Sequence, residues 1–322
     1  MLLASVALSL LLACGGGSGL SGTVKVDGSS TVFPITEAMA EEFQLLHPRV
    51  RLTVGVSGTG GGFKKFCRGE TDISDASRPI KQSEIELCAK NGIEFLELPV
   101  AFDGLSVIVN PENDWATWIT VDELKRIWEP GSEVERWSDV RPHWPDENLL
   151  LVGADTDSGT FDYFTEAIVG EEGASRPDYI ASANDNVLVQ AVSSERFALG
   201  YFGYAYYREN KGKLKLVAVD PGSGSVLPSE QTISGGLYQP LSRPLLIYVS
   251  RSSLEDKPEV VEFVQFYLDP ESVILVKDVG YVGFPAGLYQ LVNQRLLGRV
   301  TGTMFPGGSQ VGLTIEELLA EE

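Results

Sequence analysis

Four short segments of the 322-residue sequence combine serine, threonine and glycine, with Arg78 as their single basic residue. Hydroxyl and backbone N–H groups donate hydrogen bonds, and glycine lets a ligand approach the main chain closely. Such segments suit either a serine nucleophile or a nest of donors around an anion. The segments are 27–33 (DGSSTVF), 57–63 (SGTGGGF), 74–79 (SDASRP) and 155–161 (DTDSGTF).

The sequence argues against a serine nucleophile, because it offers no clear general base to activate one. A catalytic serine is usually activated by a histidine that a third group orients, and the chain has two histidines, His47 and His143, neither in a motif. Ser158 lies in DSGTF, which is not the G-x-S-x-G turn of α/β-hydrolases. We therefore expect a protein that is not an enzyme, with no catalytic residue, cofactor or metal site.

The four segments fall where apolar runs give way to helical patterns. Runs such as RLTVGVS and PLLIYVS predict strands, and their alternation with helices predicts the α/β class. Ligands of open α/β sheets bind beyond the carboxyl ends of the strands. Three predicted helices begin inside these segments and offer free N–H groups, which together favour a shared tetrahedral anion. Ordinary helix capping is the alternative for any single one. Ser83 and Glu86 predict the cap of a further helix.

The charge and the N-terminus limit the partners and the location. The net charge of −20, from 45 acidic and 25 basic residues, makes a nucleic-acid partner unfavourable. Residues 1–13 are apolar and uncharged like a signal peptide, although a basic start is missing. LLAC resembles a bacterial lipobox in which Cys14 is lipidated, followed by a Gly/Ser linker over 14–22; a buried N-terminal strand is the alternative.

Export changes how the other two cysteines are interpreted. Cys67 and Cys88 form an even pair outside the cytosol, where disulfides persist, so we expect them to be bridged. The aromatic residues Tyr201, Phe202 and Tyr204 are expected in the core rather than at a ligand.

Several long motifs resemble one family. VDGSSTVFPITEAMAEEF, VGVSGTGGGFKKFCRGETDISDASRPI, DTDSGTFDYF and DNVLVQAV…ALGYFGYAYY are similar to the substrate-binding protein of the high-affinity phosphate ABC transporter, in the branch found in cyanobacteria and related bacteria. The resemblance runs from Thr23 to near the C-terminus. It implies a two-lobed periplasmic-binding-protein fold of type II with two crossover strands, AFDGLSVIV and PLSRPLLIYV. Lobe I would combine 23–103 with 240–322, and lobe II would span 104–239.

The resemblance also implies a single phosphate held in the cleft by hydrogen bonds. Many relatives place an arginine before the DSGT turn and an aspartate in the third segment, where this chain has Ala154 and Ser77-Arg78. Our hypothesis is that the charges have exchanged segments, with Arg78 as the cation and Asp157 as acceptor of the phosphate proton, unless Asp157 is a plain helix cap. The remaining positions that carry over are Ser30, Thr31, Val32 (through its N–H), Thr59, Gly60, Gly61, Ser77, Ser158, Gly159 and Thr160.

The expected function follows from the resemblance together with the anion-binding composition. We expect a lipid-anchored monomer, in the periplasm or on the outer face of the cell membrane, that captures inorganic phosphate and delivers it to an ABC permease. The alternatives are a binder of sulfate, molybdate or arsenate, a phosphate sensor or adhesin without transport, and, least favoured, a secreted phosphatase.

Overall fold

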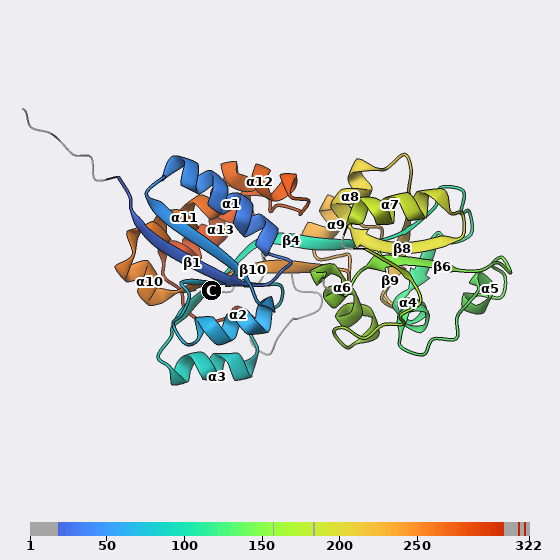
Figure 1. Ribbon diagram of the computed structural model, residues 1–322, viewed down its shortest axis with the longest axis horizontal. Coiled ribbons are helices and arrows are strands. Elements are labelled where there is room, and N and C mark those ends of the chain that lie inside the picture. The colour runs from blue at the N-terminus through green and yellow to red at the C-terminus, as the bar shows by residue number, and fades with distance from the viewer. Residues whose placement is uncertain (1–18, 157, 183, 306–314, 316–318, 320–322) are drawn as a thin grey trace, which may run out of the picture.

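Two lobes lie side by side in the computed structural model, which describes residues 19–156, 158–182 and 184–305 together with Ile315 and Leu319. Two long strands, β4 (Phe95–Val109) and β10 (Ser242–Ser250), run from one lobe into the other (Figure 1). They pair with each other in antiparallel fashion, with Ser242 opposite Gly104 and Ser250 opposite Phe95. The two predicted crossover strands are therefore confirmed.

The sheet of the first lobe brings three of the polar segments to one edge. Its strand order is β2-β1-β3-β10-β4, and β1 is parallel to both β2 and β3. Because parallel strands end at the same edge of a sheet, the residues that follow them lie together. The strands that precede the first three segments are β1 (Gly22–Gly28), β2 (Val50–Val56) and β3 (Ile73–Ala76).

The second lobe continues the pairing from the far half of β4. Strand β8 (Ala198–Gly203) is antiparallel to β4 and parallel to β6 (Leu150–Ala154), which carries the fourth polar segment at its end. Strand β7 (Ile180–Ser182) flanks β6. On another path, β9 (Lys215–Asp220) joins β4 to β5 (Trp118–Thr120).

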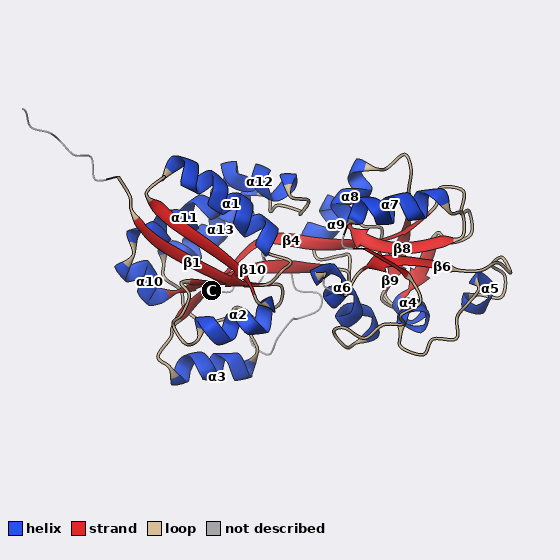
Figure 2. Ribbon diagram, viewed as in Figure 1, coloured by secondary structure: helices blue, strands red, loops and turns tan. Residues whose placement is uncertain are grey.

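Helices cover both sheets and bury their apolar faces, which confirms the α/β class (Figure 2). The predicted core residues Tyr201, Phe202 and Tyr204 are buried, and Tyr201 stacks on Phe164 with ring centroids 3.6 Å apart. In the first lobe the helices are α1 (Phe33–Leu46), α2 (Gly58–Phe66), α3 (Gln82–Lys90), α10 (Arg251–Asp256), α11 (Pro258–Tyr267), η2 (Pro270–Ser272), α12 (Val273–Asp278) and α13 (Ala286–Leu297). In the second they are α4 (Val121–Trp128), α5 (Trp137–Val140), α6 (Gly159–Phe164), η1 (Thr165–Val169), α7 (Asp185–Ser194), α8 (Tyr204–Glu209) and α9 (Glu230–Ser234).

Helix α3 begins one residue before the predicted cap, so the Ser83–Glu86 pair is wrong as a capping box. The carboxylate that turns back on the helix start is Glu84, which accepts a hydrogen bond from the backbone N–H of Lys81 at 2.8 Å. The chain leaves β3 through Pro79, which fixes an extended backbone just before the helix. This shift of register places Glu84 where it also meets Arg78.

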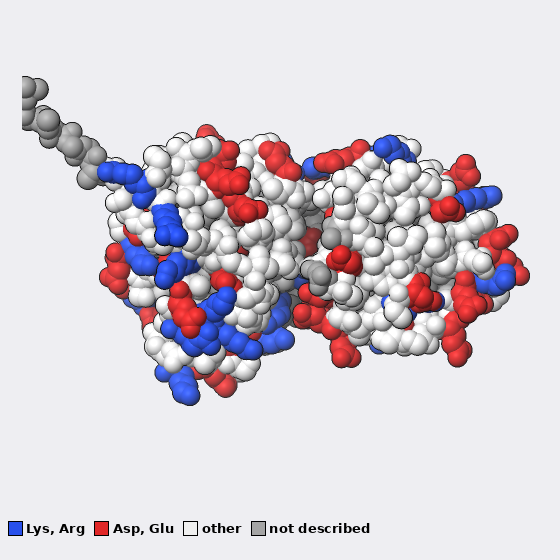
Figure 3. Space-filling model, in the orientation of Figure 1, with Lys and Arg blue, Asp and Glu red and all other residues white. Residues whose placement is uncertain are grey.

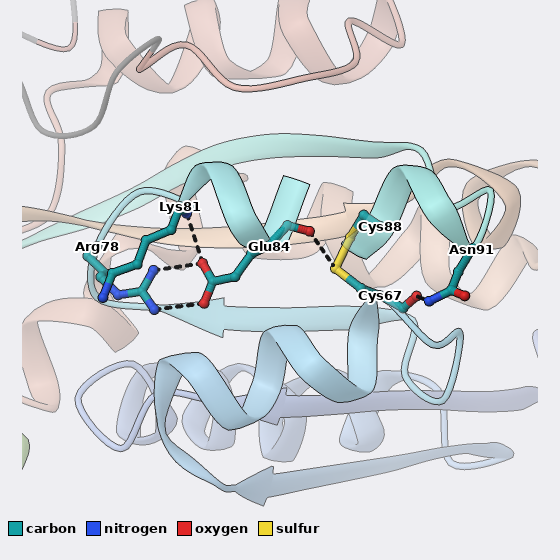
Figure 4. Close-up of a disulfide and its surroundings, with 6 residues drawn as sticks. All are labelled: Cys67, Arg78, Lys81, Glu84, Cys88 and Asn91. Carbon is teal, nitrogen blue, oxygen red and sulfur yellow. Dashed lines mark hydrogen bonds and ion pairs between the residues drawn. A yellow bond between two sulfur atoms is a disulfide. The ribbon is translucent and has the colours of Figure 1, made fainter. Parts of the chain in front are cut away.

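The predicted disulfide is present between Cys67 and Cys88, 21 residues apart (Figure 4). Cys67 directly follows α2 and Cys88 lies near the end of α3, so the bridge joins the two helices. The side-chain amide of Asn91 donates to the carbonyl of Cys67 at 2.8 Å and adds a second link between the same elements.

Replacing both bridged cysteines by alanine is expected to lower the free energy of unfolding by about 3 kcal/mol, because the open loop gains conformational entropy in the unfolded chain. Urea denaturation of the Cys67→Ala/Cys88→Ala variant measures this loss. Wild-type protein under reductant is the control and should lose a similar amount. Equal urea midpoints for variant and wild type would show that the bridge adds no stability.

No helix within the described part of the chain is long and apolar enough to cross a membrane. Cys14, the predicted lipidation site, and Asp157, the predicted proton acceptor, lie outside the described residues.

Candidate functional site

The four polar segments surround one cavity of about 370 Å³ between the lobes. On the molecular surface the face between the two lobes is hollowed, and basic side chains gather over α2 and α3 (Figure 3). Most lining residues belong to the predicted segments, and the others lie outside them, on α6, η1 and β10 and in the adjoining loops. The lining residues are Ser29, Ser30, Thr31, Ser57, Gly58, Thr59, Gly60, Gly61, Ser77, Arg78, Lys81, Gly159, Asp162, Tyr163, Glu166, Glu172 and Arg243.

The first segment is a tight turn between β1 and α1. The hydroxyl oxygen of Ser29 accepts from the backbone N–H of Thr31 at 3.2 Å, and the carbonyl of Ser29 accepts from Phe33 N–H at 3.0 Å. This turn sets Ser30 and Thr31 on the cavity wall. Val32 is buried beneath them as the residue before α1, so only its backbone is a candidate contact.

The second and third segments are joined to each other. The Oγ atoms of Thr59 and Ser77 lie 3.1 Å apart, and the backbone N–H of Ser77 donates to Thr59 Oγ1 at 3.3 Å. Both residues line the cavity beside Gly60 and Gly61, at the start of α2. The first N–H groups of an α-helix lack partners inside the helix, and those of α2 point from its N-terminus toward the cavity.

Close packing explains why α2 contains a glycine at position 62. A Cβ atom added to Gly62 would lie 2.6 Å from the Cα of Gly28 and 3.0 Å from the carbonyl oxygen of Asp27, both on β1. These neighbours are backbone atoms that cannot rotate away. Gly62 therefore lets α2 lie directly against the strand that leads into the first segment.

We expect Gly62→Ala to lower the free energy of unfolding by about 2 kcal/mol, since overpacking against backbone forces α2 away from β1. Gly60→Ala is the matched variant in the same helix, because its Cβ would be 3.8 Å from the nearest atom, Nη2 of Arg78. Thermal denaturation without ligand compares the two. A Gly62→Ala protein as stable as Gly60→Ala would contradict the packing account.

Arg78, the predicted cation of the site, lines the cavity but is held by a carboxylate (Figure 4). Its Nη1 and Nη2 atoms donate to the two oxygens of Glu84 at 2.9 and 2.8 Å, and Nη1 also donates to the carbonyl of Pro79 at 3.1 Å. Both guanidinium nitrogens at the tip are thus engaged from α3.

The fourth segment faces the first across the cavity. The hydroxyl oxygen of Ser158 accepts from the backbone N–H of Thr160 at 3.2 Å, so Ser158 caps α6, and neither residue is among those that line the cavity. Gly159 does line it. A Cβ atom on Gly159 would lie 2.3 Å from Oγ1 of Thr31 and 2.9 Å from Oγ of Ser30, which shows how closely the two lobes approach here.

Arg243 lies on β10, outside the four segments predicted from the sequence, and its side chain lines the same cavity. Its Nη2 atom is 3.2 Å from Oγ1 of Thr31, 3.4 Å from Oδ2 of Asp103 and 3.5 Å from the carbonyl oxygen of Gly159. Its guanidinium lies over the ring of Tyr163 at 3.7 Å from the centroid. A lone arginine inside an otherwise apolar predicted strand was the available signal.

Carboxylates on the second lobe complete the lining. Asp162, Glu166 and Glu172 line the cavity opposite Arg78 and Lys81 of the first lobe. Burial raises the pKa of Asp162, and the negative charge of Glu172 raises it further. Burial likewise raises the pKa of Asp103, although the charge of Arg243 opposes that shift. Within the described ranges, no three His, Cys, Asp or Glu side chains are grouped as a metal site would need.

Comparison with known proteins identifies the family. Residues 16–271 match the model of the PBP superfamily domain. The chain belongs to the PBP superfamily. Within that superfamily it belongs to the same family as the proteins named SphX and PstS. This confirms the family resemblance seen in the sequence motifs and the predicted fold class.

Three relatives illustrate the match. Protein SphX of Synechocystis sp. is 50% identical over 304 residues, which cover 94% of this chain and 90% of that protein. The phosphate-binding protein PstS of Staphylococcus saprophyticus is 40% identical over 299 residues, covering 91% and 92%. The crystal structure of a possible phosphate binding protein from Planctomyces limnophilus is 50% identical, with a TM-score of 0.81, covering 87% of this chain and 99% of that one.

Proposed function

We propose that this member of the family captures inorganic phosphate in the cavity between its lobes and delivers it to an ABC permease. One observation carries the proposal: hydroxyl and N–H donors from four separate segments line a single cavity together with two arginines. A tetrahedral oxyanion presents acceptors in every direction, so donors that converge from several sides match it. The names of the related SphX, PstS and Planctomyces proteins support the same ligand.

The donors divide into hydroxyls and backbone groups. The N-terminus of α2 points unpaired N–H groups toward a bound anion and stabilises negative charge. At α1 the backbone donor is the N–H of Val32, the residue before the helix, because the N–H groups of the helix's own first turn are already paired. Ser158 and Thr160 support the site from behind by shaping the start of α6. In this proposal the hydroxyl donors are Ser30, Thr31, Thr59 and Ser77, and the backbone donors are Val32, Gly60, Gly61 and Gly159.

The net charge of −20 does not oppose this function strongly. Exposed charges farther than about 8 Å from a bound anion are largely screened at physiological ionic strength. The donors of the cavity act at contact distance. Asp157 remains our proposed acceptor for the phosphate proton, a proton that sulfate lacks at neutral pH.

The lobes and the location complete the proposal. Lobe I would comprise 23–103 and 240–322 and lobe II 104–239, with the linkers inside β4 and β10, so that bending these strands closes the cavity. The chain would act as a non-enzymatic monomer, exported through a signal peptide over 1–13 and anchored through Cys14. Metabolic labelling with a fatty acid, compared between wild type and Cys14→Ser, tests the anchor.

Isothermal titration with phosphate, sulfate and molybdate tests the ligand. We expect phosphate to bind far more tightly than the other two anions. If sulfate or molybdate binds tightly and phosphate does not, the ligand of this protein is that other oxyanion. Hydrolysis of a phosphomonoester by the purified chain would establish the enzyme alternative.

A further inference from the structure

Two arginines line the anion cavity, and they differ in what holds them. Arg78 forms a two-pronged ion pair with Glu84 at 2.8 and 2.9 Å (Figure 4). A planar guanidinium matched to both oxygens of one carboxylate uses the donors that would otherwise grip an anion. The positive charge of Arg78 is therefore compensated inside the first lobe.

Arg243 is held much more loosely. Among the described residues its one carboxylate contact is Oδ2 of Asp103, 3.4 Å away, beyond the usual range of a charge-assisted hydrogen bond. Its Nε is buried without a hydrogen-bond partner among the described residues. The side chain is only 12% exposed, so water solvates its guanidinium poorly. Its N–H groups can therefore still donate to an acceptor that enters the cavity.

The surroundings of Arg243 fix its plane and its place. The ring of Tyr163, 3.7 Å from the guanidinium, holds one face by cation–π contact. The same Nη2 atom reaches Thr31 of the first lobe and Gly159 of the second at 3.2 and 3.5 Å. A single cation on a crossover strand thus contacts both walls of the cavity.

We propose that Arg243 supplies the positive charge that binds the anion, with Tyr163 and Asp103 as positioning residues. This inference rests on the proposed function and specifies its cation. On binding, two phosphate oxygens replace the hydroxyl of Thr31 and the carbonyl of Gly159 as acceptors of the guanidinium. Asp103 does not line the cavity and remains behind the arginine.

The assignment differs from the sequence-based hypothesis that Arg78 is the cation. In our account Arg78 forms part of the cavity wall and Glu84 neutralises its charge, whereas Arg243 binds the anion from crossover strand β10. Because Arg243 contacts segments of both lobes, an anion bound to it draws the first and fourth segments together.

Matched glutamine variants test the assignment. Arg243→Gln and Arg78→Gln each remove one cation from a carboxylate partner, so they change the net charge of the cavity equally. We expect Arg243→Gln to weaken the binding of inorganic phosphate about a hundredfold and Arg78→Gln less than about fivefold, in isothermal titration at low and high salt. Arg243→Lys should lose about tenfold, because it keeps the charge but not the planar fork, and it should keep the salt dependence that Arg243→Gln loses.

Thermal denaturation without anion shows whether each variant is folded. If Arg243→Gln does not fold, the phosphate affinities of Arg243→Lys and Arg78→Lys are compared instead. The assignment is overturned if the Arg78 variant loses more affinity than its Arg243 counterpart, or if Arg243→Gln stays within about threefold of wild type. If the wild-type chain binds sulfate or molybdate and no phosphate, the proposed function fails. The same variants titrated with that anion still decide the role of Arg243.

Discussion

Gly159→Ala is expected to weaken phosphate binding about a thousandfold, equivalent to about 4 kcal/mol. The added methyl group would lie 2.3 Å from Oγ1 of Thr31, 2.9 Å from Oγ of Ser30 and 3.2 Å from the backbone nitrogen of Thr31. The two hydroxyls are the side-chain donors of the first segment, on the opposite lobe. The methyl group must push them out of position or hold the lobes apart, and either change removes donors from the anion. Isothermal titration with inorganic phosphate measures the effect.

Gly287→Ala is the matched control for this substitution. Gly287 lies in the first turn of α13, its backbone is not left-handed, and an added Cβ would have no neighbour within 4 Å. Alanine there should leave phosphate affinity unchanged and stabilise the chain by about 0.5–1 kcal/mol, since glycine is a poor helix former. If Gly159→Ala binds phosphate as well as Gly287→Ala does, the two segments do not enclose the anion together.

Asp75→Asn is expected to change how stability depends on pH. Asp75 lies on β3 with its side chain completely buried, and burial, together with the nearby negative charge of Asp27, raises its pKa to about 8. In the unfolded chain its pKa is about 3.9. Between these values the folded protein holds a proton that the unfolded chain has released, so stability falls as pH rises through this window.

The size of this effect follows from one proton. Wild type should lose about 1.4 kcal/mol of unfolding free energy for each pH unit in this window, relative to Asp75→Asn, which cannot ionise. Urea denaturation from pH 5 to pH 7, without phosphate, compares the two proteins, and their difference removes the titrations that both share. Parallel pH profiles would show that Asp75 is ionised in the fold.

The segments of the site were predictable because their chemistry is local. Serine, threonine and glycine at the ends of apolar runs indicate strand-to-helix junctions, and parallel strands bring such junctions to one edge. Thr31, Thr59, Ser77 and Gly159 therefore lie on the cavity where the sequence placed them. The pairing of Cys67 with Cys88 was predictable for a similarly simple reason. Disulfides persist in exported proteins, and these two cysteines are the pair that remains once Cys14 is set aside.

The charges of the site were not predictable in the same way, because they depend on side-chain partners distant in sequence. Arg78 is the arginine inside a polar segment, yet its guanidinium turns to Glu84, whose position depends on where α3 begins. Arg243 lies in a strand, and it meets Asp103 only because β10 pairs with β4 in one register. Periodicity predicts a strand but not its register with a partner 140 residues away.

Competition between phosphate and sulfate tests the central claim most directly. The wild-type chain, freed of bound anion and titrated calorimetrically with phosphate in the presence of excess sulfate, should still bind phosphate with one site per chain and a nearly unchanged Kd. Arg243→Gln in the same experiment should show a Kd about a hundredfold higher. A wild-type chain whose phosphate signal disappears as sulfate is added would contradict the account, because the cavity would then hold oxyanions without distinguishing phosphate.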